Sequence, residues 1–108
     1  MQITVLVLVR QPKGSFRDAI VRGIGADSDE PFTVKYAKKR GRRGGWAKVS
    51  LPGSPGVVNI GWDGASGILT CRALTRGQNS PEEIVANFVY YLLSRHRKKI
   101  SSIIVKST

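Results

Sequence analysis

Positively charged side chains gather around one tryptophan near the middle of the chain. Between residues 35 and 48 the sequence places Lys35, Lys38, Lys39, Arg40, Arg42, Arg43, Trp46 and Lys48. Lysine and arginine neutralise phosphate groups, and the flat face of an indole ring can stack on an unpaired base. A basic stretch with an aromatic residue inside it is therefore typical of a surface that holds a single nucleic-acid strand.

Residues that catalyse reactions or hold metal ions are few. The chain has one cysteine, Cys71, and one histidine, His96, which excludes a zinc site built from these ligands. His96 stands among arginines and lysines with no nucleophile beside it, and the acidic residues form no evident pair for catalytic metals. The glycines form neither a phosphate-binding loop nor a dinucleotide-binding motif. We expect no catalytic residue, no metal and no cofactor.

Hydrophobic spacing and turn residues divide the chain into strands and helices. Strands are expected at residues 2–9, 32–39, 46–51, 57–62, 68–74 and 101–106, and helices at residues 15–24 and 80–97. An Asp-Gly pair at residues 63–64 signals a hairpin turn. The order β-α-β-β-β-β-α-β predicts one α+β domain over residues 1–108, with a mostly antiparallel β-sheet, two helices and a fold other than the OB-fold.

Two interpretations fit residues 15–24. Phe16, Ile20 and Ile24 recur every four residues, as on one face of a helix, and Ser15 could cap that helix. Gly25 would then end it. The same stretch also alternates as a strand would, so a strand remains the alternative to the preferred helix.

The second helix has a stronger start signal. Ser80 can cap it, Pro81 suits the first helical position, and Glu83 can close a capping box. The residues expected on its apolar face are Ile84, Phe88, Tyr91 and Leu92. Its last turn is basic, which complements the dipole of the helix.

Alternation along the middle strands assigns one face to the core and the other to solvent. The expected core residues are Phe32, Val34, Tyr36, Ala47, Val49, Leu51, Val58, Ile60, Trp62, Leu69, Cys71 and Ala73. The opposite face then carries Lys35, Trp46, Lys48, Asn59 and Arg72, with no acid among them. Asn59 could add a hydrogen bond to a base edge. Two alternatives stay open: Trp46 could complete the core, and the 38–43 cluster could be a solvated hairpin tip.

The overall charge indicates a polyanionic partner. Eighteen lysines and arginines stand against seven acidic residues in 108, giving a formal net charge of +11 and an isoelectric point near 10.6. A domain this basic is typical of nucleic-acid binders. No apolar run is long enough to span a membrane, and residues 1–9 lack the basic start of a secretory signal. One cysteine suits a reducing compartment, so we expect a cytoplasmic protein with no membrane partner.

Residues 2–9 are apolar on both faces of the expected strand. Such a strand lies at the centre of a sheet or is covered by a second subunit. Because the chain is also small, we expect a homo-oligomer, either a dimer or a tetramer.

Two parts of the sequence carry a resemblance to a known family. They are the basic central strands, residues 32–48 with Trp46, and the closing unit that runs from Ser80-Pro-Glu-Glu-Ile through Phe88-Val-Tyr-Tyr to Ser101-Ser-Ile-Ile-Val105. Over most of its length the chain is similar to the archaeal ThermoDBP single-stranded DNA-binding proteins and their shorter relatives. The resemblance implies a non-OB fold, sequence-tolerant binding of single-stranded DNA and a homo-oligomer. The longer members have a coiled-coil tail that this chain lacks.

The leading hypothesis is a non-enzymatic protein that binds single strands, DNA more than RNA, with little sequence preference. A structural or ribosome-associated RNA-binding protein is the main alternative, because the loop rich in glycine and arginine at residues 40–45 and the basic helix end would also suit folded RNA. An interaction module for an acidic protein or a membrane surface would use the same charge without needing Trp46. A nuclease whose acidic residues converge only in the fold is the last alternative.

Overall fold

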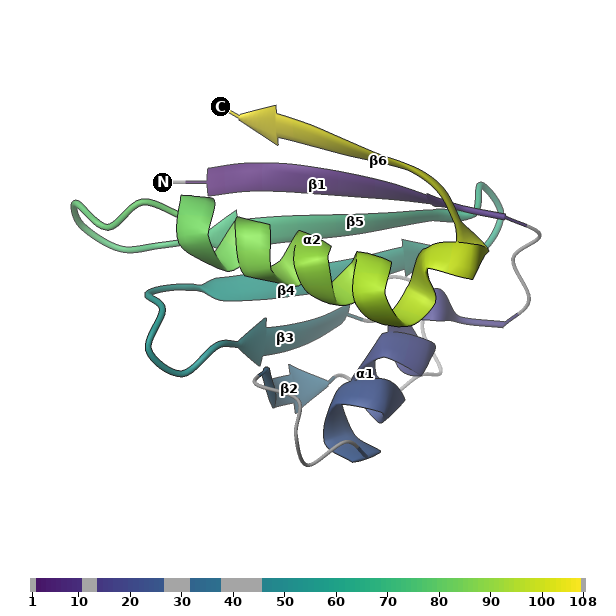
Figure 1. The fold of residues 1–108 in the computed structure, drawn as a ribbon, viewed down its shortest axis with the longest axis horizontal. Helices are drawn as coiled ribbons and strands as arrows, with labels where there is room; N and C mark the ends of the chain where they lie inside the picture. The colour runs from purple at the N-terminus through teal and green to yellow at the C-terminus, as the bar shows by residue number, and fades with distance from the viewer. Residues whose placement is uncertain (1, 11–13, 27–31, 38–45, 108) are drawn as a thin grey trace.

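The computed structural model describes residues 2–10, 14–26, 32–37 and 46–107. Its elements in chain order are β1 (Gln2–Val9), α1 (Phe16–Ala26), β2 (Thr33–Ala37), β3 (Trp46–Ser50), β4 (Val57–Asp63), β5 (Ile68–Leu74), α2 (Glu82–His96), the short 3-10 helix η1 (Arg97–Lys99) and β6 (Ile100–Ser107) (Figure 1). This order confirms the predicted α+β fold.

The six strands form one sheet with the spatial order β2-β3-β4-β5-β1-β6, and every neighbouring pair is antiparallel. β1 hydrogen-bonds to β5 on one side and to β6 on the other. The apolar N-terminal strand is therefore central in the sheet, and its second apolar side, with the half-buried Leu6 and Leu8, lies on the face opposite the helices. Both helices lie on the same face of the sheet, so the described part of the chain has two layers (Figure 1).

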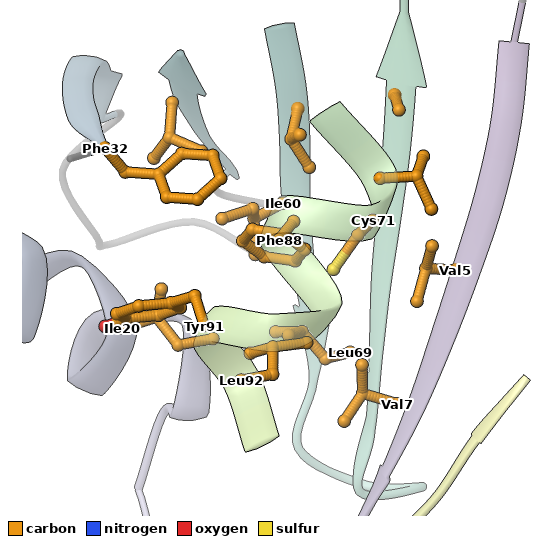
Figure 2. Packing of buried hydrophobic residues seen from close by; sticks show 14 of the residues in the cluster. Val5, Val7, Ile20, Phe32, Ile60, Leu69, Cys71, Phe88, Tyr91 and Leu92 are labelled. Atoms are coloured by element: carbon orange, nitrogen blue, oxygen red, sulfur yellow. The ribbon is translucent and has the colours of Figure 1, made fainter. Parts of the chain in front are cut away.

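The core lies between the two helices and the sheet. Figure 2 shows Phe88, Tyr91 and Leu92 of α2 pointing toward the strands, with Ile20 of α1 beside Tyr91. The buried residues of the middle strands and β1 are Ile3, Val5, Val7, Ala47, Val49, Val58, Ile60, Leu69, Cys71 and Ala73. The rings of Phe32 and Phe88 meet edge to face, 5.8 Å between centroids. The predicted apolar face of the second helix and the alternation of β3, β4 and β5 are thus confirmed.

The pairing of β2 with β3 contains a bulge. Val34 pairs with the buried Val49, but the register shifts before Tyr36, which pairs with Lys48. One extra residue in β2 therefore shifts the backbone register of this strand. Of the residues predicted to share the core face, Phe32 is buried and Val34 packs against the core, whereas the side chain of Tyr36 lies outside what the structure describes.

α1 is a helix, as preferred over the strand. The backbone N–H of Asp18 donates to Ser15 Oγ at 3.2 Å, so Ser15 is the predicted cap. The Asp18 carboxylate accepts from its neighbour Arg17, with 2.6 Å between Nη2 and Oδ1. The helix continues to Ala26, so the predicted stop at Gly25 is wrong, because Gly25 keeps a helical backbone.

α2 begins one residue later than predicted. Pro81 is the N-cap, without a side-chain hydrogen bond, and the N–H of Val85 donates to the Pro81 carbonyl at 3.0 Å. The first helical residue is Glu82, so Glu83 is second in the helix and cannot close a capping box with Ser80. The predicted Ser80 cap is therefore wrong.

Asp63 holds the hairpin between β4 and β5. Its carboxylate accepts from Ser66 Oγ at 2.9 Å and from the N–H of Ala65 at 3.0 Å, and these bonds lower the pKa of Asp63, the Ser66 bond most. The N–H of Gly67 donates to the Asp63 carbonyl at 2.9 Å, and Gly67 has φ of 71°. The hairpin is confirmed, with its left-handed residue at the end of the turn.

Candidate nucleic-acid interface

The sheet face opposite the helices, termed the open face, carries a row of polar and basic residues. Strand register sets Lys48 beside Asn59 and Asn59 beside Arg72. The row continues from Arg72 to Thr4 and from Thr4 to Lys106. These residues, called the polar row, include three cations and no acid. They cross five adjacent strands, and a spacing of about 4.8 Å per strand pair separates Lys48 from Lys106 by about 19 Å.

A second row on the open face offers flat and apolar surface. Trp46 lies opposite Gly61, and Gly61 lies opposite Thr70. Leu6 and Ile104 continue this row toward the β6 edge. Because Gly61 has no side chain, the strand next to the indole is left uncovered. Trp46 is half-buried and is not part of the core cluster, so the structure does not support the alternative in which it completes the core.

Lys48 lies close to the Trp46 ring. Its Nζ is 5.7 Å from the ring centroid, which is within the range of a cation–π interaction. Such pairs contribute about 0.5–1 kcal/mol at exposed sites. The ammonium group therefore lies over one face of the indole.

A cavity of about 370 Å³ opens beside Trp46 on the open face. Its lining residues are Trp46, Asn59, Ile60, Gly61, Thr70 and Arg72. Oδ1 of Asn59 is buried and has no hydrogen-bond partner among the residues that the structure describes. An unpaired buried acceptor costs about 1–3 kcal/mol. Asn59 therefore has unused hydrogen-bonding capacity in the wall of a cavity, where a ligand N–H could use it.

Replacing Asn59 with valine is expected to stabilise the free protein and to weaken binding. Valine removes the unpaired acceptor and favours a strand, so the free energy of unfolding should rise by about 1 kcal/mol. Loss of the amide should lower the affinity for an oligonucleotide about threefold or more, the value of one modest hydrogen bond. Urea unfolding and anisotropy titration measure the two effects. A variant that is less stable and binds equally well would show that the amide serves the fold alone.

The structure brings part of the predicted site together. Trp46, Lys48, Asn59 and Arg72 lie on adjacent strands of the open face. Lys35 is in the bulged part of β2, at one edge of the sheet. The remaining predicted residues, Lys38, Lys39, Arg40, Arg42 and Arg43, lie outside the described residues. Sequence reasoning missed Thr4 and Lys106, because their place in the polar row depends on how β1 pairs with β5 and β6.

Two other side chains that could react or stack, Cys71 and Trp62, lie on the core side of the sheet. Cys71 is fully buried, and burial raises the pKa of its thiol far above the ordinary value. The thiol is therefore neutral and out of contact with solvent. Trp62 packs against the core, with its ring centroid 6.3 Å from that of Phe16.

His96 is half-buried between two aromatic rings. Its ring centroid is 5.3 Å from that of Phe16 and 5.6 Å from that of Tyr91, and Nε2 lies 3.3 Å from the Tyr91 hydroxyl oxygen. Desolvation, followed by the charges of Lys99 and Arg95, lowers the pKa of His96 below its ordinary value of about 6.5.

Mild acid is expected to destabilise the protein through His96. Because its pKa is lowered in the fold, the unfolded chain binds the proton more tightly. The free energy of unfolding therefore falls as the pH drops below about 6.5, until the folded group is protonated as well. Chemical unfolding at pH 7.5 and pH 5.5 measures this loss. His96→Phe keeps a ring in place and should be less sensitive to pH; equal sensitivity in both proteins would contradict the assignment.

Within residues 2–10, 14–26, 32–37 and 46–107, no group of three or more histidine, cysteine, aspartate or glutamate side chains could hold a metal ion. No helix in that part of the chain is long and apolar enough to cross a membrane. Comparisons with protein-family models, with curated proteins and with solved structures gave no match. The interface is therefore interpreted from its own residues and geometry.

Proposed function

We propose that this protein binds single-stranded nucleic acid on the open face, DNA in preference to RNA, without catalysing a reaction. The observation that carries the proposal is the polar row with Trp46 beside it, on a sheet face that no described helix covers. In this arrangement Lys48, Arg72 and Lys106 contact phosphates, and an unpaired base stacks on Trp46.

The shape of the open face favours a single strand over a duplex. The DNA major groove is about 12 Å wide and admits a helix or a two-stranded ribbon. A polar row that crosses five strands over about 19 Å is too broad to enter it. Stacking and charge are also largely independent of base identity, so we propose sequence-tolerant binding.

Fluorescence anisotropy with labelled single-stranded DNA, single-stranded RNA and duplex DNA tests the function at two or more salt concentrations. Single-stranded DNA should bind at least about tenfold more tightly than the duplex, the value of one stacked base. If the three cations of the polar row each neutralise one phosphate of a nucleic-acid strand, the slope of log affinity against log salt concentration should be about −2. If all three nucleic acids bind alike and weaken together with salt, only bulk charge is acting and the proposal fails.

A structural RNA-binding protein is the second candidate function. It is favoured by the exposed cations of the α2 end and η1, which are Arg95, Arg97, Lys98 and Lys99. These side chains belong to the helix layer, and folded RNA is recognised by its shape and its phosphates. An RNA hairpin that binds more tightly than every single strand, and that is insensitive to Trp46→Ala, would favour this function over the first.

We also propose that two chains assemble through β6. This strand is at the edge of the sheet, and Ile104 and Val105 are 45% and 53% exposed. An edge strand presents unpaired backbone groups that an identical antiparallel strand can satisfy about a two-fold axis. A register centred on Ile104 joins the two isoleucines and sets Lys106 opposite Ser102 of the partner subunit, so that the lysines do not face each other. The two polar rows would then form one surface.

Light scattering after size exclusion tests the assembly. The wild type should have twice the 11.8 kDa chain mass, and Ile104→Lys, which opposes two cations at the centre of the interface, should have the mass of one chain. Thr4→Lys, on the neighbouring central strand, is the control and should remain a dimer. A wild type with the mass of one chain at tens of micromolar would exclude the assembly.

A further inference from the structure

A second and larger cavity lies in the helix layer, away from the open face. Its volume is about 720 Å³, and it lies where the end of β1, the first turns of α1 and η1 meet. Trp62 forms part of its lining and pairs in the sheet with the buried Leu69, so this part of the lining is on the core side. Trp46 and the polar row are on the other side of the sheet. The two cavities therefore share no residue.

Four cations line this second cavity. They are Arg10, Arg22, Lys98 and Lys99. All four are exposed, and none forms an ion pair with a residue that the structure describes. Among the residues that the structure describes, the one acid in the lining is Asp18, whose carboxylate is already bonded to Arg17 at 2.6 Å. The described lining therefore carries an excess of positive charge, suited to a ligand with one or more negative charges.

A backbone hydrogen bond joins two of the segments that carry these cations. The N–H of Arg10 donates to the Lys99 carbonyl at 2.8 Å, which joins the end of β1 to η1. Arg22 extends from α1, which packs on the same sheet. The positive charges thus come from three elements whose positions are set by the core.

The cavity also has an aromatic wall. Trp62 is half-buried, Phe16 is buried, and their rings lie at 57° with 6.3 Å between centroids. Pockets for small organic ligands have volumes of about 300–1,000 Å³, and this cavity falls in that range. An inorganic anion would use the cations alone. A flat apolar group attached to the anion would use the wall as well.

We propose that this cavity binds a nucleoside phosphate, with the phosphate among Arg10, Arg22, Lys98 and Lys99 and the base against Trp62. The phosphate satisfies the clustered cations, and the base replaces water on the half-buried indole of Trp62. The ligand is a free nucleotide or the 5′-phosphorylated end of a strand, which share this chemistry. The site shares no lining residue with the cavity of the open face, so nucleotide binding here is independent of the proposed function of the open face.

Titration with adenosine 5′-monophosphate tests the site. The chain has two tryptophans, so Trp46→Phe leaves Trp62 as the only indole, and its fluorescence reports on the cavity. The nucleotide should change this fluorescence saturably, and adenosine and inorganic phosphate should each bind at least about tenfold more weakly, because each lacks one of the two contacts. Equal affinity for inorganic phosphate, or no binding of the nucleotide, would overturn the proposal.

Charge variants in the Trp46→Phe protein locate the ligand. Arg22→Gln with Lys98→Gln should weaken nucleotide binding about tenfold or more. The matched control is Arg76→Gln, an exposed arginine in the turn before α2, which should leave the affinity unchanged. All these cations are exposed, so the substitutions should leave the urea midpoint of unfolding close to that of the Trp46→Phe protein. If the control weakens binding as much as the double variant, the cavity is not a specific site.

Two further comparisons separate this site from the open face and identify the source of the ligand. Lys48→Gln with Arg72→Gln should leave nucleotide affinity unchanged; a loss there would move the ligand to the open face and overturn the assignment. A 5′-phosphorylated oligonucleotide should bind more tightly than its 5′-hydroxyl form if the source is a strand end, and the Arg22 and Lys98 variant should abolish the difference. Equal binding of the two forms, with nucleotide binding retained, assigns the cavity to free nucleotides.

Discussion

Replacing Trp46 with alanine is expected to weaken the binding of single-stranded DNA by roughly 5- to 150-fold, the range for loss of one stacked base. The ring lies on the open face, beside Gly61 and close to the ammonium group of Lys48. Removing it takes away the stacking surface and leaves the charges of the polar row in place. The slope of affinity against salt should therefore change little, whereas the affinity at every salt concentration falls. Anisotropy titrations at several salt concentrations measure both quantities.

Two control variants make this result specific. Tyr90 is the most exposed large hydrophobic residue of the described chain, 73% exposed, and it lies on α2 in the other layer. Tyr90→Ala should leave the affinity unchanged, because that ring is not on the open face. Trp46→Phe keeps a smaller aromatic surface and should retain part of the affinity. If Trp46→Ala binds as tightly as the wild type, stacking on the open face is ruled out.

Gly56→Ala is expected to destabilise the fold by about 3 kcal/mol or more, from backbone strain of about 1–3 kcal/mol plus steric overlap. Gly56 has φ of 101°, which side chains with a Cβ rarely adopt. A Cβ there would lie 2.6 Å from the Leu74 carbonyl oxygen and 2.7 Å from Thr75 Cγ2. The residue immediately precedes β4, so the distortion would reach the strand that carries Asn59. Urea unfolding followed by circular dichroism measures the loss.

Gly53→Ala is the matched control for this effect. Gly53 lies in the same turn and has φ of 91°, but no atom of the described residues outside its immediate chain neighbours lies within 4 Å of its added Cβ. This substitution should cost about 1–2 kcal/mol from backbone strain alone. The difference between the two variants then reports the steric overlap at Gly56. Equal losses would show that the close approach to Leu74 does not restrict this turn.

Local patterns in the sequence predicted the parts of the fold that depend on local physics. The four-residue recurrence of Phe16, Ile20 and Ile24 predicted α1, and all three side chains are buried. Alternation in β3 separated the buried Ala47 and Val49 from Trp46 and Lys48 in the same way. In both elements one face is buried, and the apolar residues recur in the sequence with the spacing of that buried face. The spacing therefore predicts the element.

The errors arose where a single residue shifts the pattern. The extra residue in β2 shifts its backbone pairing with β3, and no residue type in that strand signals a bulge. Because α2 starts at Glu82, its N-cap is Pro81 and not Ser80, although the sequence of a capping box is present. A bulge or a helix start can shift by one residue without any change in the apolar pattern, so the pattern alone does not predict either feature.

The candidate site shows the same division between local and long-range information. Trp46, Lys48, Asn59 and Arg72 were predicted because they alternate with core residues on consecutive strands. Thr4 and Lys106 depend on β1 inserting between β5 and β6, a pairing between the two ends of the chain. The positive cavity of the helix layer was not predicted either, because Arg10, Arg22 and Lys98 are distant in sequence and meet only in the fold.

Amide chemical-shift mapping by NMR with an unlabelled oligothymidine tests the central claim most directly. The claim is that the open face of the sheet, and not the general positive charge of the chain, holds the strand. We predict that the largest shifts fall on β3, β4 and β5, at Trp46, Lys48, Asn59 and Arg72, with the Trp46 indole N–H among them. Shifts concentrated on the basic end of α2 and η1, with the open face unchanged, would contradict the claim.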